Sequence, residues 1–452
     1  THEQRFPNGM KPIADYVHGL GMKAGLYTDA GNSTCGSMWD NDAAGVGAGI
    51  YGHEPQDAQL YFGDWGFDFI KIDYCGGDAL GLNEKERYTS IRNSIDKVNK
   101  DVSINICRWA FPGTWAKDAA TSWRISGDIN AHWGSLRYVV GKNLYLSAYA
   151  GNGHYNDMDM MVIGFRNDSK VGGQGLTPTE EEAHFGLWCI MSSPLLIGCN
   201  LENMPDSSLK LLTNKELIAL NQDPLGLQAY VAQHENEGYV LVKDIEQKRG
   251  NVRAVALYNP SDTICSFSVP FSSLEFGGNV KVRDLVKHSD LGNFSGTFEQ
   301  TLPAHSAMFL RIEGETRLEP TLYEAEWAYL PLFNDLGKNP KGIIYAHDKE
   351  ASGKMKVGFL GGQPENYAEW REVYSENGGR YDMTIHYLYG KGRQIELDVN
   401  GIITKIDSLG KDNGHNQITV PVELKAGYNT IRMGNSYNWA PDIDCFTLTK
   451  AL

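Results

Sequence analysis

Short apolar runs alternate with amphipathic stretches through the first half of the chain. Each run is rich in apolar residues and ends in polar or charged side chains, as buried parallel strands do. The six runs are Lys23–Asp29, Gly66–Cys75, Val102–Arg108, Ser122–Asp128, His154–Met160 and Pro194–Gly198. Apolar residues with the spacing of a helix lie between these runs, at Tyr88, Ile91, Ile95 and Val98 and after the capping box Thr177–Glu180. The alternation predicts six β/α units of an α/β (β/α)8 TIM barrel.

A barrel of this type closes with eight strands, and two are not visible in the pattern. Because the visible units follow one another along the chain, we expect the first two β/α units to precede Thr1. Six strands alone would leave two long unpaired edges. The predicted catalytic domain therefore covers residues 1–226 and is N-terminally incomplete.

The pattern changes from about Leu227 to short strands with turn residues between them. This spacing predicts an antiparallel β-sandwich over residues 227–313 and, after a polar linker at 314–320, a second β-sandwich over 321–452. Period-two alternation is clear in Tyr381–Tyr387 and Gln394–Val399.

Composition narrows the class of protein. The 452 residues carry a net charge of −15, which argues against nucleic acid or an anionic membrane as a partner. No apolar run is long enough to span a membrane. Aromatic residues make up 11% of the chain, which suits sugar binding, and the sequence has no GxSxG elbow and no phosphate-binding loop.

The run ending at Asp73 carries the first candidate for catalysis. Lys71 and Asp73 are two residues apart, so in a strand their side chains point to the same side. Active sites of α/β barrels lie at the carboxyl ends of the strands, which is where Asp73 falls. A buried Lys–Asp ion pair with a purely structural role is the alternative.

Further carboxylates and aromatic residues follow the other predicted strands. Asp128 comes after Gly127, and aromatic side chains at the same ends are Tyr27, Tyr74, Trp109 and Trp123. Glycoside hydrolysis needs two carboxyl groups that flank the anomeric carbon. Lys71 favours an ionised, nucleophilic Asp73, which leaves Asp128 as the proton donor. The alternative for Asp128 is a cap of the next helix.

A weaker alternative is a metal site. Asp157-Met-Asp159 is a DxD sequence, which in some glycosyltransferases holds a divalent ion and a nucleotide sugar. No second acidic cluster or phosphate loop supports that interpretation, and His154 beside it is better explained as a structural histidine.

Several motifs together resemble glycoside hydrolase family 27, the retaining α-galactosidases and α-N-acetylgalactosaminidases. They are Phe6–Lys11, Gly25–Gly31, Lys71–Cys75, Trp123–Ile129, Tyr155–Met160 and Asn221–Gly226, in the family's order. The resemblance extends over roughly the first 310 residues, and agreement of several motifs is more specific than any single one.

The resemblance implies a role for each matching residue. Asp73 takes the position of the family's nucleophile and Asp128 that of its acid/base. Cys35 and Cys75 match a disulfide at the rim of the pocket. Positions that contact the sugar in the family correspond to Tyr27, Lys71, Arg124, Asp159 and Met160.

Three departures from the family pattern matter. Two upstream strands of the family pattern are absent here. In the family they end in a Trp and an Asp pair that hold the galactose 4- and 6-hydroxyls. That Asp position also helps separate α-galactosidases from β-L-arabinopyranosidases. Arg108, beside Trp109, stands where the α-galactosidases usually carry Glu near the sugar 2-position, and its bulk disfavours an N-acetyl pocket unless it turns away. The usual partner of Cys107 is missing, so we expect a free thiol there.

The last domain resembles carbohydrate-binding modules of families 6 and 35. The matching segments are Tyr323–Glu326, Gly358–Gly362, Leu424–Arg432 and Asn438–Asp444. By this resemblance Glu324, Glu326 and Asp444 would bind a structural calcium ion. Tyr437 and Trp439 would stack on a sugar, or alternatively close the sandwich core.

The expected function is hydrolysis of terminal α-linked D-galactose from oligo- or polysaccharides, with retention and without a cofactor in catalysis. Within the family, β-L-arabinopyranosidase and α-N-acetylgalactosaminidase activities are the alternatives. A non-catalytic carbohydrate-binding protein is the alternative from another class. The substrate class leads us to expect a secreted or periplasmic protein, and no oligomeric state is predicted.

Overall fold

The computed structural model describes residues 2–165, 174–235, 237–336, 342–407, 410 and 414–451. The chain divides into two compact units. The first unit contains Thr1–Gly127, Gly153–Asp157 and Asn334–Leu336, and the second contains Asp128–Asn152, Met158–Phe333 and Gly337–Leu452. Residues 1–226, predicted as one barrel domain, are therefore shared between both units.

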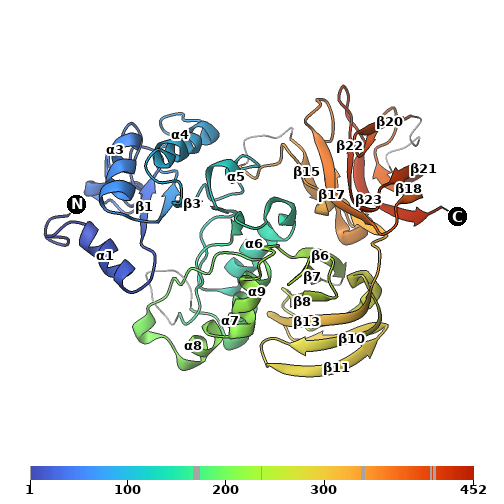
Figure 1. The fold of residues 1–452 in the computed structure, drawn as a ribbon, viewed down its shortest axis with the longest axis horizontal. Helices are drawn as coiled ribbons and strands as arrows, with labels where there is room; N and C mark the ends of the chain where they lie inside the picture. Colours follow the sequence, from blue (N-terminus) through green and yellow to red (C-terminus); the bar gives the residue numbers. More distant parts are fainter. Residues whose placement is uncertain are drawn as a thin grey trace. The chain divides into compact units, whose positions relative to one another are not determined.

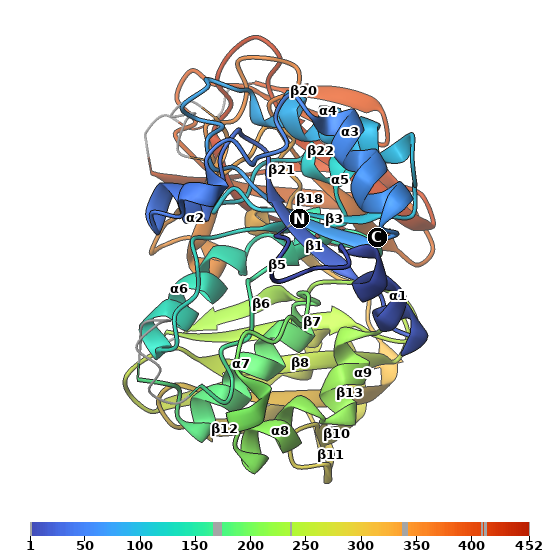
Figure 2. The same ribbon diagram turned by 90° about the vertical axis from the view of Figure 1, so that its left-hand side faces the viewer.

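A parallel sheet forms the centre of the first unit (Figure 1 and Figure 2). Its strands lie in chain order: β1 (Gly25–Asp29), β2 (Phe69–Asp73), β3 (Ser103–Ile106), β4 (Ser122–Arg124) and β5 (Tyr155–Asp157). The helices of this unit are α1 (Lys11–Gly19), α2 (Cys35–Trp39), α3 (Glu54–Ala58), α4 (Glu84–Asp96) and α5 (Ala116–Ala119). Parallel strands in sequence order confirm the predicted β/α architecture.

The predicted sixth strand is wrong. Among the described residues, Pro194–Gly198 contributes only an isolated parallel bridge between Met161 and Ile197. Pro194 has no N–H to donate to a ladder, which limits strand formation at this segment. In this bridge the N–H of Met161 donates to the carbonyl of Leu196 at 2.7 Å.

The helices of the second unit pack beside an antiparallel sandwich. They are α6 (Trp133–Asn143), α7 (Pro178–Ile190), α8 (Asp206–Leu212) and α9 (Lys215–Asn221). Helix α7 starts with the predicted capping box: the Thr177 side chain accepts from the N–H of Glu180, and the Glu180 carboxylate accepts from the N–H of Thr177. Most of α7 is buried.

The antiparallel sandwich places a six-stranded sheet over a two-stranded one. The strands are β6 (Tyr230–Glu235), β7 (Gly238–Asp244), β8 (Val252–Asn259), β9 (Cys265–Pro270), β10 (Phe276–Asp284), β11 (Ser289–Ser295), β12 (Thr297–Leu302) and β13 (Ser306–Arg317). The large sheet has the order β11-β10-β13-β8-β7-β6, and β12 pairs with β9. Strand β9 alternates buried and exposed residues, so its inner face enters the core beside Phe298.

Strand β13 continues to Arg317, so the first four residues of the predicted linker at 314–320 are strand. Arg317 explains the extension. Its guanidinium forms ion pairs with Asp244 at 2.8 Å and with Glu275 at 3.0 Å, which fixes this end of the strand.

The C-terminal module is a second β-sandwich, as predicted. One sheet has the order β15-β16-β23-β18-β21, with β14 on β23, and the other has the order β17-β22-β19-β20. The strands are β14 (Leu322–Glu324), β15 (Ile344–His347), β16 (Met355–Gly358), β17 (Tyr367–Ser375), β18 (Gly379–Leu388), β19 (Ile395–Val399), β20 (Ile402–Ile406), β21 (His415–Leu424), β22 (Gly427–Gly434) and β23 (Asp442–Lys450). The alternating runs from Tyr381 and Gln394 correspond to β18 and β19. No helix in the described ranges is long and apolar enough to cross a membrane.

Helix α7 approaches strand β13 very closely at Gly186. A Cβ atom at this position would lie 2.0 Å from Cε2 of Phe309, which is fully buried. The glycine therefore allows the helix to rest directly on the aromatic ring.

Gly186→Ala should lower the midpoint of thermal unfolding. Overpacking costs about 1–3 kcal/mol, which exceeds the gain in helix propensity of about 1 kcal/mol. Gly141→Ala in α6 is the matched control, because nothing lies within 4 Å of its added Cβ, and should keep or raise the midpoint. Scanning calorimetry compares the two, and an unchanged midpoint for Gly186→Ala would contradict the close approach.

Candidate active site

The register of β1 and β2 gathers four polar side chains in the first unit. Tyr27 is paired with Lys71, and Asp29 with Asp73. Because residues two apart in a strand share one side, all four belong to the same face of this strand pair. The Tyr27 hydroxyl donates to Oδ2 of Asp73 at 2.9 Å, and Nζ of Lys71 lies 3.7 Å from Oδ1 of Asp73.

Asp73 is buried, with 7% of its surface exposed. Lys71 and the Tyr27 hydroxyl both stabilise its ionised form. Oδ1 of Asp73 accepts no hydrogen bond from any described residue, and its ion-pair contact is the ammonium of Lys71. Burial, followed by the charge of Asp73, raises the pKa of Tyr27 far above its ordinary value, so this phenol remains a donor.

The disulfide implied by the family resemblance is present between Cys35 and Cys75, whose Cα atoms are 5.2 Å apart. The Asp29 carboxylate accepts hydrogen bonds from both cysteines. The backbone N–H groups of Cys35 and Cys75 each donate to the Asp29 carboxylate at 3.2 Å. Burial, and then the charge of Asp73, raises the pKa of Asp29 to about 6.

Arg108 is held by acidic neighbours in the first unit. Its guanidinium pairs with Asp78 at 3.0 Å and with Glu84 at 3.3 Å, and lies 4.8 Å from the centre of the Tyr74 ring. Trp109 follows with a φ of 57°, a strained backbone conformation for a tryptophan. Cys107 is a buried free thiol, as predicted, and burial raises its pKa.

Arg124 at the end of β4 is almost fully buried. One Nη of its guanidinium donates to the carbonyl of Ser126 at 3.2 Å, and the other lies 3.9 Å from the sulfur of Cys107. Next to it in the sheet, Oδ2 of Asp157 accepts from the Asn105 side chain at 2.8 Å.

Asp128 begins the second unit directly after Gly127 and is exposed. It does not cap the following helix, because the N-cap of α6 is His132, whose ring accepts from the N–H of Ser135. The alternative explanation for Asp128 is therefore wrong.

Asp159 fixes the backbone next to Asp128. The N–H of Ile129 donates to one oxygen of Asp159 at 2.9 Å, and the N–H of Met160 donates to the other at 2.8 Å. The φ of Asp159 is 78°, and its carbonyl accepts from the Trp188 indole at 2.8 Å. Met160 is 44% exposed. Because protein donors already bind the carboxylates of Asp157 and Asp159, the hydrogen bonds favour positioning roles over the DxD metal hypothesis.

Asp29 and Asn105 support the site, although the sequence pattern alone assigned neither of them a role in it. A signal for Asp29 was present, since it ends an apolar run and precedes a glycine-rich loop, as Asp73 does. Asn105 carried no such signal, because an amide inside a buried strand does not reveal which carboxylate it contacts.

A second candidate site lies in the C-terminal module. Glu324, Glu326 and Asp444 are 4%, 1% and 6% exposed. Both oxygens of Glu326 and one oxygen of Glu324 accept no hydrogen bond from the described residues. Oxygens of Glu324 and Asp444 lie within 4.8 Å of each other and of the Cys445 sulfur.

The donor set fits a calcium ion. Buried carboxylates without a cation are costly, and calcium prefers an all-oxygen environment. Gly353 lies against the acids, since a Cβ there would be 2.2 Å from Oε1 of Glu326. Burial raises the pKa of Glu324 to about 7 and that of Asp444 to about 6, and the pKa of Glu326 is also raised by burial and by Glu324.

Tyr437 and Trp439 are exposed by 79% and 44%. The interpretation that these rings close the sandwich core is therefore wrong. The Phe359 ring meets Trp439 edge to face at 6.3 Å, and Nζ of Lys405 lies 5.8 Å from the centre of the Tyr437 ring.

Comparison with known proteins identifies the family to which the chain is similar. Residues 1–223 match the family model described as alpha galactosidase A, and residues 238–312 match the alpha galactosidase C-terminal beta sandwich domain. The chain is 37% identical to Alpha-galactosidase 3 of Arabidopsis thaliana over 67% of its length and 66% of that protein. It is 34% identical to Alpha-galactosidase A of Cellvibrio japonicus over 69% of its length and 77% of that protein.

Solved structures of similar proteins indicate the same family. A putative alpha-galactosidase/melibiase of Bacteroides fragilis matches with a TM-score of 0.60 and 33% identity, covering 68% of this chain and 66% of its own. Alpha-galactosidase I of Mortierella vinacea matches with a TM-score of 0.59 and 26% identity, covering 69% and 82%. The chain spans about two thirds of the length of the Arabidopsis relative. These matches, together with the Asp73 site and the disulfide, show that the chain belongs to the α-galactosidase family, glycoside hydrolase family 27, with the family's α/β barrel and antiparallel sandwich.

Proposed function

We propose that the protein hydrolyses terminal α-D-galactosides with retention of configuration. The observation that carries the proposal is the buried Asp73 carboxylate, oriented by Tyr27 and paired with Lys71. Asp128, beside a backbone held by Asp159, is the proposed acid/base. The similarity to proteins named α-galactosidases supports galactose over the alternative sugars.

Two displacements account for the reaction. An oxygen of Asp73 attacks the anomeric carbon from the β face while Asp128 gives its proton to the glycosidic oxygen, so the C–O bond to the leaving group breaks. A water molecule then attacks the β-linked glycosyl-enzyme from the α face. Asp128 takes the proton of that water, and Asp73 leaves as a carboxylate. Lys71 stabilises the carboxylate that is consumed and released.

Azide should distinguish the two acids. Asp73→Ala with azide and an aryl α-galactoside should give the β-galactosyl azide, because azide replaces the nucleophile. Asp128→Ala should give the α-galactosyl azide, because azide attacks the glycosyl-enzyme. Without azide, each variant should lose about 10⁴-fold in kcat. Proton NMR of the products identifies the anomers.

Asp118→Asn, on the exposed part of α5, is the matched control and should keep parental activity. An α-azide from Asp73→Ala would reverse the assignment of the two acids. Parental turnover in both alanine variants would show that neither acid is catalytic, whereas no turnover by the parental chain would indicate a non-catalytic carbohydrate-binding protein.

We further propose that Glu324, Glu326 and Asp444 bind a structural calcium ion. The support is their burial without an ion-pair partner among the described residues and the close approach of Gly353, where only a residue without a Cβ leaves room beside Glu326. Because burial raises their pKa values, the metal-free fold is most stable when the acids are protonated. It loses stability as the pH rises from about 4, the unfolded carboxyl value, through the folded values of about 6 and 7.

Calcium should therefore raise the midpoint of thermal unfolding of EDTA-treated protein at pH 7.5 and have little effect at pH 4.5. Gly353→Ala should abolish the calcium shift, because its Cβ would collide with Glu326. Gly401→Ala is the control: it also has a positive φ in this module, but nothing lies within 4 Å of its added Cβ. A calcium shift equal at both pH values would contradict the site.

The exposed rings of Tyr437 and Trp439 lead us to propose a sugar-binding surface on the module. Tyr437→Ala and Trp439→Ala should each weaken retention on a galactan affinity gel by about 2- to 10-fold, since a contact with an aromatic ring is worth about 0.5–1.5 kcal/mol. Tyr367→Ala, at a half-buried ring of β17, is the comparison. Parental retention by both variants would remove these rings from sugar binding.

A further inference from the structure

A cavity of about 270 Å³ lies inside the second unit, where the antiparallel sandwich packs against the C-terminal module. Strands β6, β7, β8 and β13 contribute to one wall, and β17 and β22 contribute to another. None of the proposed catalytic, calcium-binding or sugar-stacking residues lines the cavity. Its volume is just below the usual range for ligand sites, about 300–1,000 Å³, so it suits a ligand with a single sugar-sized ring.

The charge of the cavity wall is opposite to that of the whole chain. The chain has a net charge of −15, but the wall carries more basic than acidic side chains. Its basic residues are Lys243, Lys248, Arg249, Arg253, Arg317 and Arg371, and its acidic residues are Asp244, Glu275, Glu369 and Glu372. An excess of positive charge in a partly enclosed space favours an anionic ligand.

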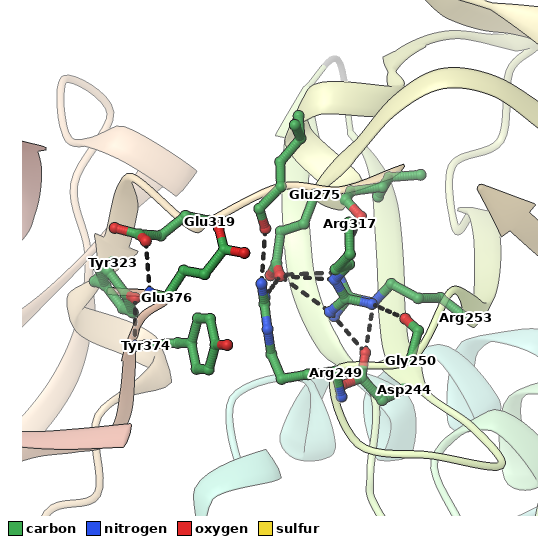
Figure 3. A network of polar contacts seen from close by, with 12 residues as sticks. Asp244, Arg249, Gly250, Arg253, Glu275, Arg317, Glu319, Tyr323, Tyr374 and Glu376 are labelled. Atoms are coloured by element: carbon green, nitrogen blue, oxygen red, sulfur yellow. Dashed lines mark hydrogen bonds and ion pairs between the residues drawn. The ribbon is translucent and has the colours of Figure 1, made fainter. Parts of the chain in front are cut away.

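The deep side of the wall is a fixed network in the antiparallel sandwich. Figure 3 shows Arg249, Arg253 and Arg317 converging on only two carboxylates, Asp244 and Glu275. Three guanidinium groups therefore share two negative charges. All five side chains lie largely out of solvent, so the excess charge is held in place rather than screened.

Arg371 supplies the group that can receive an anion. Its guanidinium lies 3.5 Å from the centre of the Tyr329 ring, and its Nε pairs with the buried Glu369. Neither of its two Nη groups has a hydrogen bond within the described part of the chain, and 45% of the side chain is exposed. A guanidinium stacked on a ring and held through Nε presents its remaining donors in the fork that matches a carboxylate.

Aromatic faces complete the wall. Tyr230, Trp327, Tyr329, Tyr374 and Tyr428 are among its lining residues, and Tyr428 is 43% exposed. A cationic side chain lies over one face of each of the four tyrosines. The other face of such a ring can pack against the C–H face of a sugar and leave its hydroxyls to the charged groups. Saccharides are also the substrates of the family to which the chain belongs.

We propose that this cavity binds a carboxylate-bearing sugar, a uronic acid that is either free or part of a glycan. The Nη groups of Arg371 hold the carboxylate, and the aromatic wall holds the ring. Glu372 also lines the cavity, where it pairs with Lys248, and 58% of its side chain is exposed. Its negative charge therefore opposes binding of an anionic ligand. The inference does not depend on the chemistry of Asp73.

Isothermal titration of the full chain tests the site, with D-galacturonate as the probe and D-galactose and acetate for comparison. Galacturonate should bind more tightly than either. Arg371→Gln should weaken its binding by about 10- to 100-fold, the range for a hydrogen bond to a charged group. Glu372→Gln should tighten it by about 2- to 5-fold, because an exposed opposing charge is removed. Structural damage would weaken binding in both variants, so opposite directions identify the charge effect.

Arg432→Gln is the matched control. Arg432 pairs with the same Glu369 and stacks on Tyr367, but it does not line the cavity, so its loss should leave binding unchanged. A galacturonate-terminated oligosaccharide that binds more tightly than the free acid assigns the site to a glycan, and the reverse assigns it to the free sugar acid. No saturable galacturonate binding, equal binding of galactose or acetate, or parental binding by Arg371→Gln would overturn the proposal.

Discussion

The contact between the Tyr27 hydroxyl and the Asp73 carboxylate is the interaction on which the candidate active site depends. It requires β1 and β2 to pair in one register, because a shift of one residue would turn these side chains to opposite faces. The same register places Asp29 beside Asp73. Asp29 in turn binds the backbone at both halves of the Cys35–Cys75 disulfide. Strand pairing, disulfide and proposed nucleophile are therefore parts of one arrangement.

Buried charge is handled in two different ways along this chain. In the first unit Asp73 is matched by Lys71, and Arg108 by Asp78 and Glu84. Glu324 and Glu326 of the C-terminal module have no such partner among the described residues, and their pKa values are raised by burial. Unpaired buried charges are among the most costly features of a fold. The unpaired acids therefore support the proposal that the module binds a cation.

Local pattern predicted much of the fold, because apolar runs and capping residues act over short distances. The strand ending at Asp73 and the capping box at Thr177 lie where the sequence indicates. Predicted strands were too long at their ends, since a positive φ such as that of Asp159 is not visible in an apolar pattern. The sixth strand was wrong for a related reason, as an apolar run with a proline at its start forms only one bridge.

The site was predictable only in part. Asp73 follows from its position at a strand end, and the disulfide follows only from the family resemblance. The pairing of Arg108 with Asp78 joins residues 30 positions apart, which no local pattern reveals. The cavity beside Arg371 brings together side chains from segments that are far apart in the chain, and its charge excess exists only once they are assembled.

The role of Asp73 is tested most directly by trapping the glycosyl-enzyme. A 5-fluoro-α-galactosyl fluoride has a good leaving group, and its ring fluorine slows the second displacement, so the covalent intermediate should accumulate. Mass spectrometry of a proteolytic digest should find one fluorogalactosyl group on the peptide that contains Asp73, with the ester on that side chain. A label on any other residue, or turnover of the reagent with no labelled peptide, would contradict the account.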